Sequence, residues 1–81
     1  IPEGVISIGG GTFKNCKSLK NVYCKAIMPP VAGDQVFYNN ASDRKIYVPM
    51  ESVDAYKSAD GWKDYADSIV GYDFDNGVVV E

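Results

Sequence analysis

Hydrophobic and polar residues follow the same order twice in the first part of this 81-residue chain. The segment FKNCKSLKNVYC lies over FYNNASDRKIYV when the sequence is shifted by 24 positions. In both copies an aromatic residue is followed by a polar turn and then by a short β-prone run, at 22–24 and at 46–48. The pattern predicts a short repeat with one strand per unit, and the strands are parallel if the units stack. Five positions match in order: Phe13 with Phe37, Asn15 with Asn39, Val22 with Ile46, Tyr23 with Tyr47, and Cys24 with Val48.

Alternation along the two expected strands separates a buried face from an exposed one. The buried face has Val22 and Cys24 in the first unit, and Ile46 and Val48 in the second. We expect the two strand tyrosines, 24 residues apart, to stack in register on the other face. Such a pair suits protein or sugar contacts, because tyrosine combines a large area with a polar tip, but it equally suits cross-strand packing. The candidate binding face consists of Asn21, Tyr23, Lys45 and Tyr47.

The hydrophobic spacing changes to three or four residues after Pro49. It predicts two short helices, at 51–58 and 61–67, with Ser52 near the start of the first. The second is expected to present one apolar face, and the helices form a C-terminal cap over residues 50–74. The tail, 75–81, contains an Asn-Gly pair typical of hairpin turns. The apolar face is Trp62, Tyr65, Ala66 and Ile69, and Tyr56, Trp62 and Tyr65 are expected in the core of the cap.

The first 24 residues, IPEGVISIGGGTFKNCKSLKNVYC, resemble the BspA-like leucine-rich repeat. A further stretch, from the Pro-Pro pair at 29–30 to Phe74, is similar to the closing segment of such proteins in gut bacteria of the Bacteroides type. One departure is Thr12, at a tight packing position where the family more often has alanine. The matching positions of the first repeat are Ile1, Pro2, Val5, Ile8, Gly9, Phe13, Cys16, Leu19 and Val22.

The resemblance implies an α/β repeat fold, a short leucine-rich-repeat solenoid of about two coils, 1–24 and 25–49, with short parallel strands. The two-helix cap would close its C-terminal end. The resemblance also implies a secreted or cell-surface bacterial protein with a non-catalytic adhesion module that contacts host matrix proteins, other cells or mucosal glycans. Two alternatives stay open, a glycan-binding accessory module and a purely structural cap of a longer solenoid.

Three motifs could carry other chemistry. The run Gly9–Gly11 before Thr12 and Lys14 has the wrong order and spacing for a phosphate-binding loop, so we interpret it as a repeat turn. Cys16, at a position that resembles a buried core thiol of the family, and Cys24 are interpreted as small apolar fillers, with a disulfide left open. The stretch DFDNG at 73–77 begins like a calcium loop, but its glycine comes too early and no glutamate closes it. We expect no metal and no cofactor.

Charge and composition narrow the possible functions of the chain further. Eight basic residues against eleven acidic ones give a net charge of −3, which argues against nucleic acid as a partner. The chain contains no histidine and no apolar run near the ~20 residues of a membrane span, so we expect neither an enzyme nor a spanning segment. The start, Ile-Pro-Glu without a signal peptide, is typical of a piece of a longer protein. We expect weak self-association through an uncovered N-terminal edge with Ile1, Val5, Ile6 and Ile8.

Overall fold

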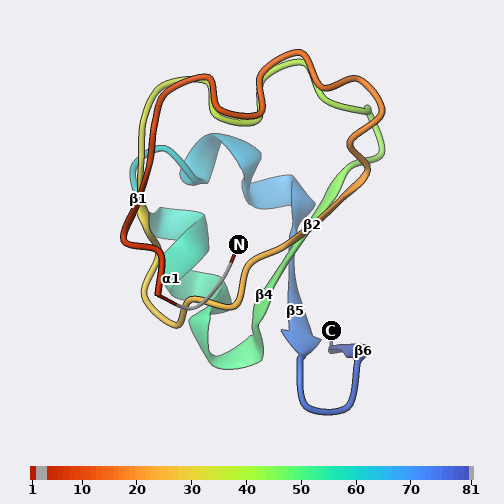
Figure 1. Cartoon of the computed structure of the whole chain (residues 1–81). Coiled ribbons are helices and arrows are strands. Elements are labelled where there is room, and N and C mark those ends of the chain that lie inside the picture. The colour runs from red at the N-terminus through yellow and green to blue at the C-terminus, as the bar shows by residue number, and fades with distance from the viewer. Residues whose placement is uncertain (2–3, 81) are drawn as a thin grey trace.

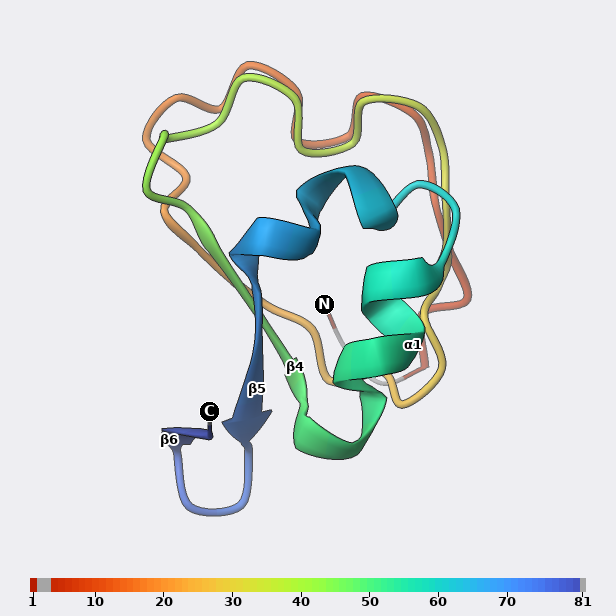
Figure 2. The same ribbon diagram turned by 180° about the vertical axis from the view of Figure 1, so that it is seen from behind.

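Short strands, most of them parallel, form the frame of the fold (Figure 1). The computed structural model describes residue 1 and residues 4–80. Within that part the chain is a small α/β domain, with strands in a curled half-barrel sheet and one short α-helix inside the curve (Figure 2). In chain order the elements are β1 (Ser7–Ile8), β2 (Asn21–Tyr23), β3 (Val31–Ala32), β4 (Lys45–Pro49), the 3₁₀ helix η1 (Met50–Ser52), α1 (Val53–Ser58), the 3₁₀ helix η2 (Lys63–Ser68), β5 (Ile69–Asp73) and β6 (Val78–Val80).

The strands of the described residues form two sheets. One is the parallel pair β1–β3, and the other has the order β2–β4–β5–β6. In the larger sheet β2, β4 and β5 run parallel, and β6 is antiparallel to β5. Helix α1 and η2 lie between the two sheets (Figures 1 and 2). The larger sheet therefore has one face toward the helices and one face toward solvent.

Residues 24 apart lie side by side along most of the first 48 positions. Ser7 pairs with Val31, and Asn21 pairs with Lys45. Between the strands the two stretches stay in step: the rings of Phe13 and Phe37 stack at 5.6 Å, and the Asn39 amide donates to the Asn15 side-chain oxygen at 3.0 Å. The left-handed backbone positions repeat too, with positive φ at Gly11 and Gln35 and at Asn15 and Asn39. The strands expected at 22–24 and 46–48 and their parallel pairing are confirmed, with bounds shifted slightly.

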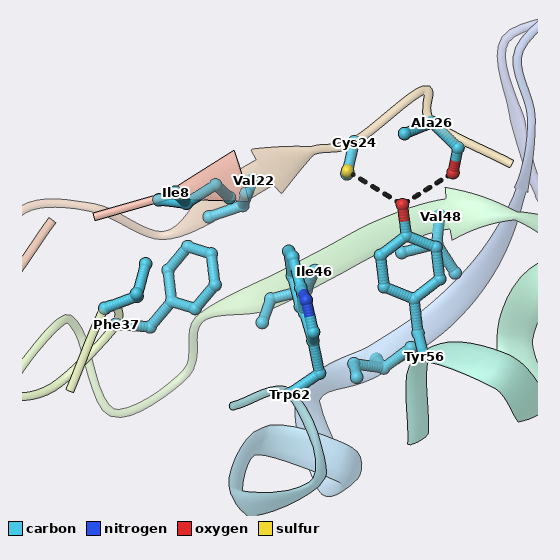
Figure 3. Packing of buried hydrophobic residues seen from close by; sticks show 11 residues of the cluster. Ile8, Val22, Cys24, Ala26, Phe37, Ile46, Val48, Tyr56 and Trp62 are labelled. Atoms are coloured by element: carbon cyan, nitrogen blue, oxygen red, sulfur yellow. Dashed lines mark hydrogen bonds between the residues drawn. The ribbon is translucent and has the colours of Figure 1, made fainter. Parts of the chain in front are cut away.

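The core lies between β2, β4 and β5 on one side and the helices on the other (Figure 3). The residues expected on the inner face of the strands, Val22, Cys24, Ile46 and Val48, are all buried there. Tyr56 and Trp62 are fully buried and meet edge to face at 4.9 Å, as expected for the cap. Each also makes a long-range hydrogen bond: the Tyr56 hydroxyl donates to the Ala26 carbonyl at 2.5 Å, and Trp62 Nε1 donates to the Pro30 carbonyl at 2.8 Å.

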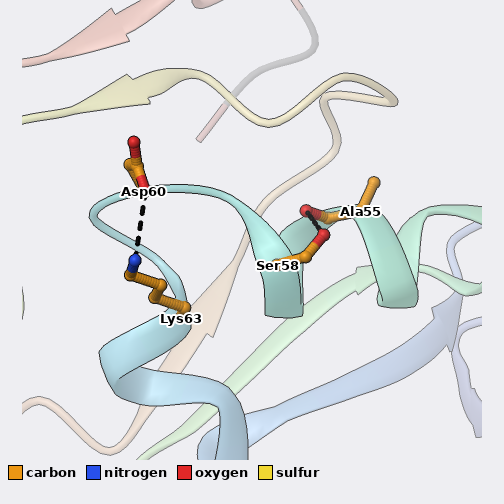
Figure 4. A network of polar contacts seen from close by, with 4 residues as sticks. All are labelled: Ala55, Ser58, Asp60 and Lys63. Carbon is orange, nitrogen blue, oxygen red and sulfur yellow. Dashed lines mark hydrogen bonds and ion pairs between the residues drawn. The ribbon is translucent and has the colours of Figure 1, made fainter.

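The first expected helix is present as η1 followed by α1. Ser52 stands at the N-cap of α1, yet its hydroxyl does not cap the helix; it donates instead to the Ile27 carbonyl at 2.6 Å. Within the last turn of α1 the Ser58 hydroxyl donates to the Ala55 carbonyl, and in the following loop an exposed Lys63–Asp60 ion pair spans 3.3 Å (Figure 4). An exposed pair of this kind contributes little to stability.

The second helix, expected at 61–67, is present but differs in type, and the expected membership of Ile69 in its apolar face is wrong. The segment is a 3₁₀ helix at Lys63–Ser68, with non-helical angles at Tyr65, and Ile69 begins β5 instead of completing a helical face. The cause is a tertiary contact. Ile69 pairs with Ile46 on the neighbouring strand, so the segment from Ile69 joins the sheet as β5. Tyr65 is only half-buried, packed against the core. The hairpin turn suggested by Asn76-Gly77 is confirmed, since residues 74–77 join β5 to β6 and Gly77 has a φ of 69°.

Two expectations about burial need correction. Cys16 is exposed, because no other described segment covers its turn. The N-terminal apolar residues are mostly covered: Ile8 is 9% exposed on the inward side of β1, Ile1 and Val5 are half-buried against the core, and only Ile6 is open, at 83%. The uncovered N-terminal surface is therefore smaller than the sequence suggests.

Candidate functional site

The solvent-facing side of the large sheet carries a stacked pair of tyrosines. Tyr23 on β2 and Tyr47 on β4 face each other at 4.7 Å between ring centroids, with an interplanar angle of 17°. The stack expected from the sequence is thus confirmed. Tyr23 is 45% exposed, because β2 is the edge strand, whereas Tyr47 is half-buried between its neighbours.

A third tyrosine, which the sequence pattern did not indicate, completes this surface. Tyr72 on β5 points its ring at both partners, with centroids 5.4 Å from Tyr23 and 5.4 Å from Tyr47 in edge-to-face geometry. Phe74 follows at 4.8 Å from Tyr72. The alternation in IVGYD carried the signal for a strand, but the helical spacing from Trp62 to Ile69 concealed it. We call Tyr23, Tyr47, Tyr72 and Phe74 the aromatic face.

The two polar residues of the candidate binding face lie beside the stack. Asn21 and Lys45 are paired at the start of β2 and β4, and both are exposed. The Tyr47 hydroxyl donates to the Asn21 side-chain oxygen at 3.3 Å, which orients the phenol along the sheet. All four candidate residues therefore share one solvent-facing surface.

At the carboxyl ends of the parallel strands the aromatic face runs into an open cleft of about 380 Å³. Tyr72 and Phe74 belong to both. Three carboxylates and one ammonium group line the cleft. The cleft therefore offers charged groups that can form hydrogen bonds, together with aromatic surface. The complete lining is Lys25, Ile27, Pro49, Met50, Glu51, Tyr72, Asp73, Phe74 and Asp75.

Asp73 is held by its own turn. Its carboxylate accepts from the backbone amides of Asp75 and Asn76, and from the Asn76 side chain at 2.7 Å. The bonds from Asn76 hold the pKa of Asp73 below its usual value, so the group stays charged at neutral pH. The calcium-like stretch is therefore a side-chain-stabilised turn, and within residues 1 and 4–80 no three potential metal ligands come together.

The glycine run and the cysteines have structural roles. Gly10 meets the backbone of Asp34, and Gly11 has a φ of 71°, so these glycines shape a turn that packs against the backbone at Gly33 and Asp34. Cys24 is buried 3.0 Å from the Tyr56 hydroxyl, and both cysteines are free thiols, so the open question of a disulfide is answered against it.

No protein-family model matches the chain, and no curated protein matches its sequence. In the described part of the chain, no helix has the length and apolar character that a membrane crossing requires. The aromatic face and its cleft must therefore be interpreted from their own chemistry. They offer aromatic area, hydroxyl groups and charges of both signs to a ligand on an open surface.

Proposed function

We propose that this chain is the C-terminal end of a leucine-rich-repeat solenoid of the BspA-like type. Support comes from the constant offset of 24 residues between paired positions, which falls in the period of leucine-rich repeats. The residues after Pro49 serve as the cap, since α1 and η2 cover the open side of the second coil with Tyr56 and Trp62. The first coil is 1–24, the second 25–49, and the cap 50–74.

The function we propose is non-catalytic binding, as an adhesion module of a secreted or cell-surface bacterial protein. The observation that carries it is the aromatic face: tyrosines from three neighbouring strands lie together on the solvent side of the sheet beside a charged cleft. Tyrosine is enriched at protein-binding surfaces because it buries much area at little entropic cost. The proposed partner is a host matrix protein, and the location rests on the family resemblance alone.

Paired substitutions test this proposal. Tyr23→Ser and Tyr47→Ser should each weaken binding of the chain to immobilised matrix proteins by about tenfold or more, as expected at a binding hot spot. Tyr38→Ser is the matched control, because Tyr38 is 51% exposed in a turn away from the sheet. Biolayer interferometry gives the affinities, and circular dichroism verifies that each variant is folded. Unchanged affinity in folded Tyr23 and Tyr47 variants would place binding elsewhere and leave the chain as a structural cap.

A glycan is the second candidate ligand, and the mixed lining of the cleft favours it. Carboxylates beside aromatic rings are groups that can hydrogen-bond sugar hydroxyls and pack against sugar rings. A glycan array separates the two candidates. Sugar binding that Glu51→Ala abolishes supports a glycan-binding accessory module, whereas a blank array together with matrix-protein binding supports adhesion to protein.

A further inference from the structure

We propose that the free edge of β6 (Val78–Val80) pairs with the same edge of a second copy of this chain, in the antiparallel direction and about a two-fold axis. We call this surface the β6 edge. Strand β6 is the last strand of the larger sheet, beyond β5, and none of the described residues pairs with its outer side (Figure 2). The pairing is independent of what the aromatic face binds.

The β6 edge lacks the features that keep other sheet edges from pairing. Natural edges are commonly protected by lysines, prolines, bulges or a covering segment. Residues 76–80, Asn-Gly-Val-Val-Val, contain no charged residue and no proline, and valine favours extended strands. Val78 is 51% exposed and Val79 is 47% exposed, so apolar area accompanies the unpaired backbone groups. An edge of this kind is a template for another strand.

The opposite edge of the same sheet, β2, is protected. Lys20 directly precedes the strand, Lys25 follows two residues after its end, and both are exposed. Part of this edge is also covered, because the Ile1 amino group donates to the Tyr23 carbonyl at 2.6 Å and the Lys25 amide donates to the Ile1 carbonyl at 2.9 Å. Pairing of β6 with β2 of a next copy would build an open row of molecules, whereas pairing of β6 with β6 closes at two copies.

Antiparallel pairing about Val79 is self-complementary. It sets Val79 opposite Val79 of the second copy, and Val78 opposite Val80, so every residue of each strand meets a valine. β-branched residues directly opposite each other stabilise an antiparallel ladder. Because the match requires a strand that is short, apolar and free of charge, and this chain supplies one, a second copy is the occupant that the sequence itself specifies.

The negative charge of the chain does not oppose this arrangement. The net charge is −3, so two copies repel each other where their acidic groups come close. Asp75 is the nearest acidic residue before β6, and it lies in the turn that leads into the strand. The two-fold axis places the two Asp75 side chains at opposite ends of the paired strands, roughly 20 Å apart at about 3.4 Å per residue. This separation exceeds the screening length of about 8 Å at physiological ionic strength.

Pairing through the β6 edge would place two aromatic faces on one continuous sheet. Val79 pairs with Tyr72, and opposite residues of an antiparallel pair point to the same side, so Val79 lies on the side of the aromatic face. A two-fold axis perpendicular to the sheet leaves both aromatic faces on that side. The dimer would then present two binding surfaces to one partner surface, which raises avidity without a new contact. This last step rests on the proposed function, whereas the pairing does not.

Sedimentation equilibrium of the full chain tests the pairing. Three residues per strand bury far less than the about 800 Å² per partner of a stable interface, so we expect a dimer that is half-formed at roughly 0.1–1 mM. Val79→Lys sets two like charges opposite each other and should weaken association at least about tenfold, while circular dichroism verifies that the monomer is folded. Ile6→Lys is the matched control, because it makes the same change at an 83% exposed position outside the larger sheet, and it should alter association less than about twofold.

A mixture of Val79→Lys and Val79→Glu chains supplies an independent readout. Each variant alone should stay monomeric at these concentrations, and the mixture should dimerise again, because the two-fold pairing sets a lysine opposite a glutamate. A strict monomer for the unsubstituted chain, or a mixture that stays monomeric, would overturn the proposal. Equal weakening by Val79→Lys and Ile6→Lys would overturn it as well, since the contact would then not be specific to the β6 edge.

Discussion

Tyr56→Phe removes one hydroxyl group that joins α1 to the segment after β2. This hydroxyl donates to the Ala26 carbonyl at 2.5 Å and lies 3.0 Å from Cys24 Sγ (Figure 3). Burial, and then the hydrogen bond with the Cys24 thiol, raises the pKa of Tyr56, so the phenol keeps its proton and remains a donor at all ordinary pH values.

The cost of the substitution follows from what it leaves behind. The ring keeps its edge-to-face contact with Trp62, so packing changes little. The Ala26 carbonyl and the Cys24 thiol, however, lose their partner in a dry site, and an unsatisfied buried polar group costs about 1–3 kcal/mol. For a domain of this length each kcal/mol lowers the melting temperature by about 4–8 °C, which gives an expected fall of about 4–24 °C.

Urea unfolding followed by circular dichroism measures this free energy. Tyr38→Phe is the matched control, because the Tyr38 hydroxyl is exposed and makes no hydrogen bond to the described residues. The same substitution made in a Cys24→Ala background should cost less, since one of the two orphaned groups is then already gone. A Tyr56→Phe loss below about 0.5 kcal/mol would refute the reasoning, because that is the range of an ordinary surface change.

Three further outcomes follow from the same contacts. Gly33→Ala should cost about 1–3 kcal/mol by thermal melting, because its Cβ would strike the backbone at Gly10, whereas Gly4→Ala, with nothing within 4 Å, should be near neutral. Trp62→Ala should cost about 3–5 kcal/mol, a large share of the about 4–12 kcal/mol expected for this length, so a urea unfolding curve that matches that of the unsubstituted chain would contradict it. Because Asn76 holds the folded pKa of Asp73 below its unfolded value, this carboxylate stabilises the β5–β6 hairpin above about pH 4 and loses that effect as pH falls through the folded pKa. Hydrogen exchange of the β6 amides should accelerate in acid beyond the intrinsic rate, and Asp73→Asn should remove that dependence.

The paired parallel strands could be predicted because the information that specifies them is local and occurs twice in the sequence. Tyr23 over Tyr47 and Asn15 beside Asn39 each occur at the same spacing, so a single shift of the sequence by 24 positions is enough to align the strand faces. Burial of Tyr56 and Trp62 followed from their spacing after Pro49 in the same way.

The remaining features depend on contacts that spacing does not encode. Ile69 fits a helical row equally well, and only its pairing with Ile46 makes it part of a strand. The same ambiguity conceals Tyr72, which needs β5 in place before it can reach the tyrosine stack. The exposure of Cys16 could not be predicted because its position resembles a buried core thiol of the family, whereas no other described segment covers its turn.

The hydrogen bonds of Tyr56 and Trp62 also bear on the order in which the chain can fold during synthesis. They span 30 and 32 residues back to Ala26 and Pro30, and the two rings fill the centre of the core. A ribosome releases residues 1–49 before it releases these aromatic residues, so the emerging strands have no complete core to pack against until α1 and η2 follow. Folding of this segment during translation would then be completed only when α1 and η2 emerge, and a chain stopped before Trp62 would present an incomplete core to chaperones and proteases.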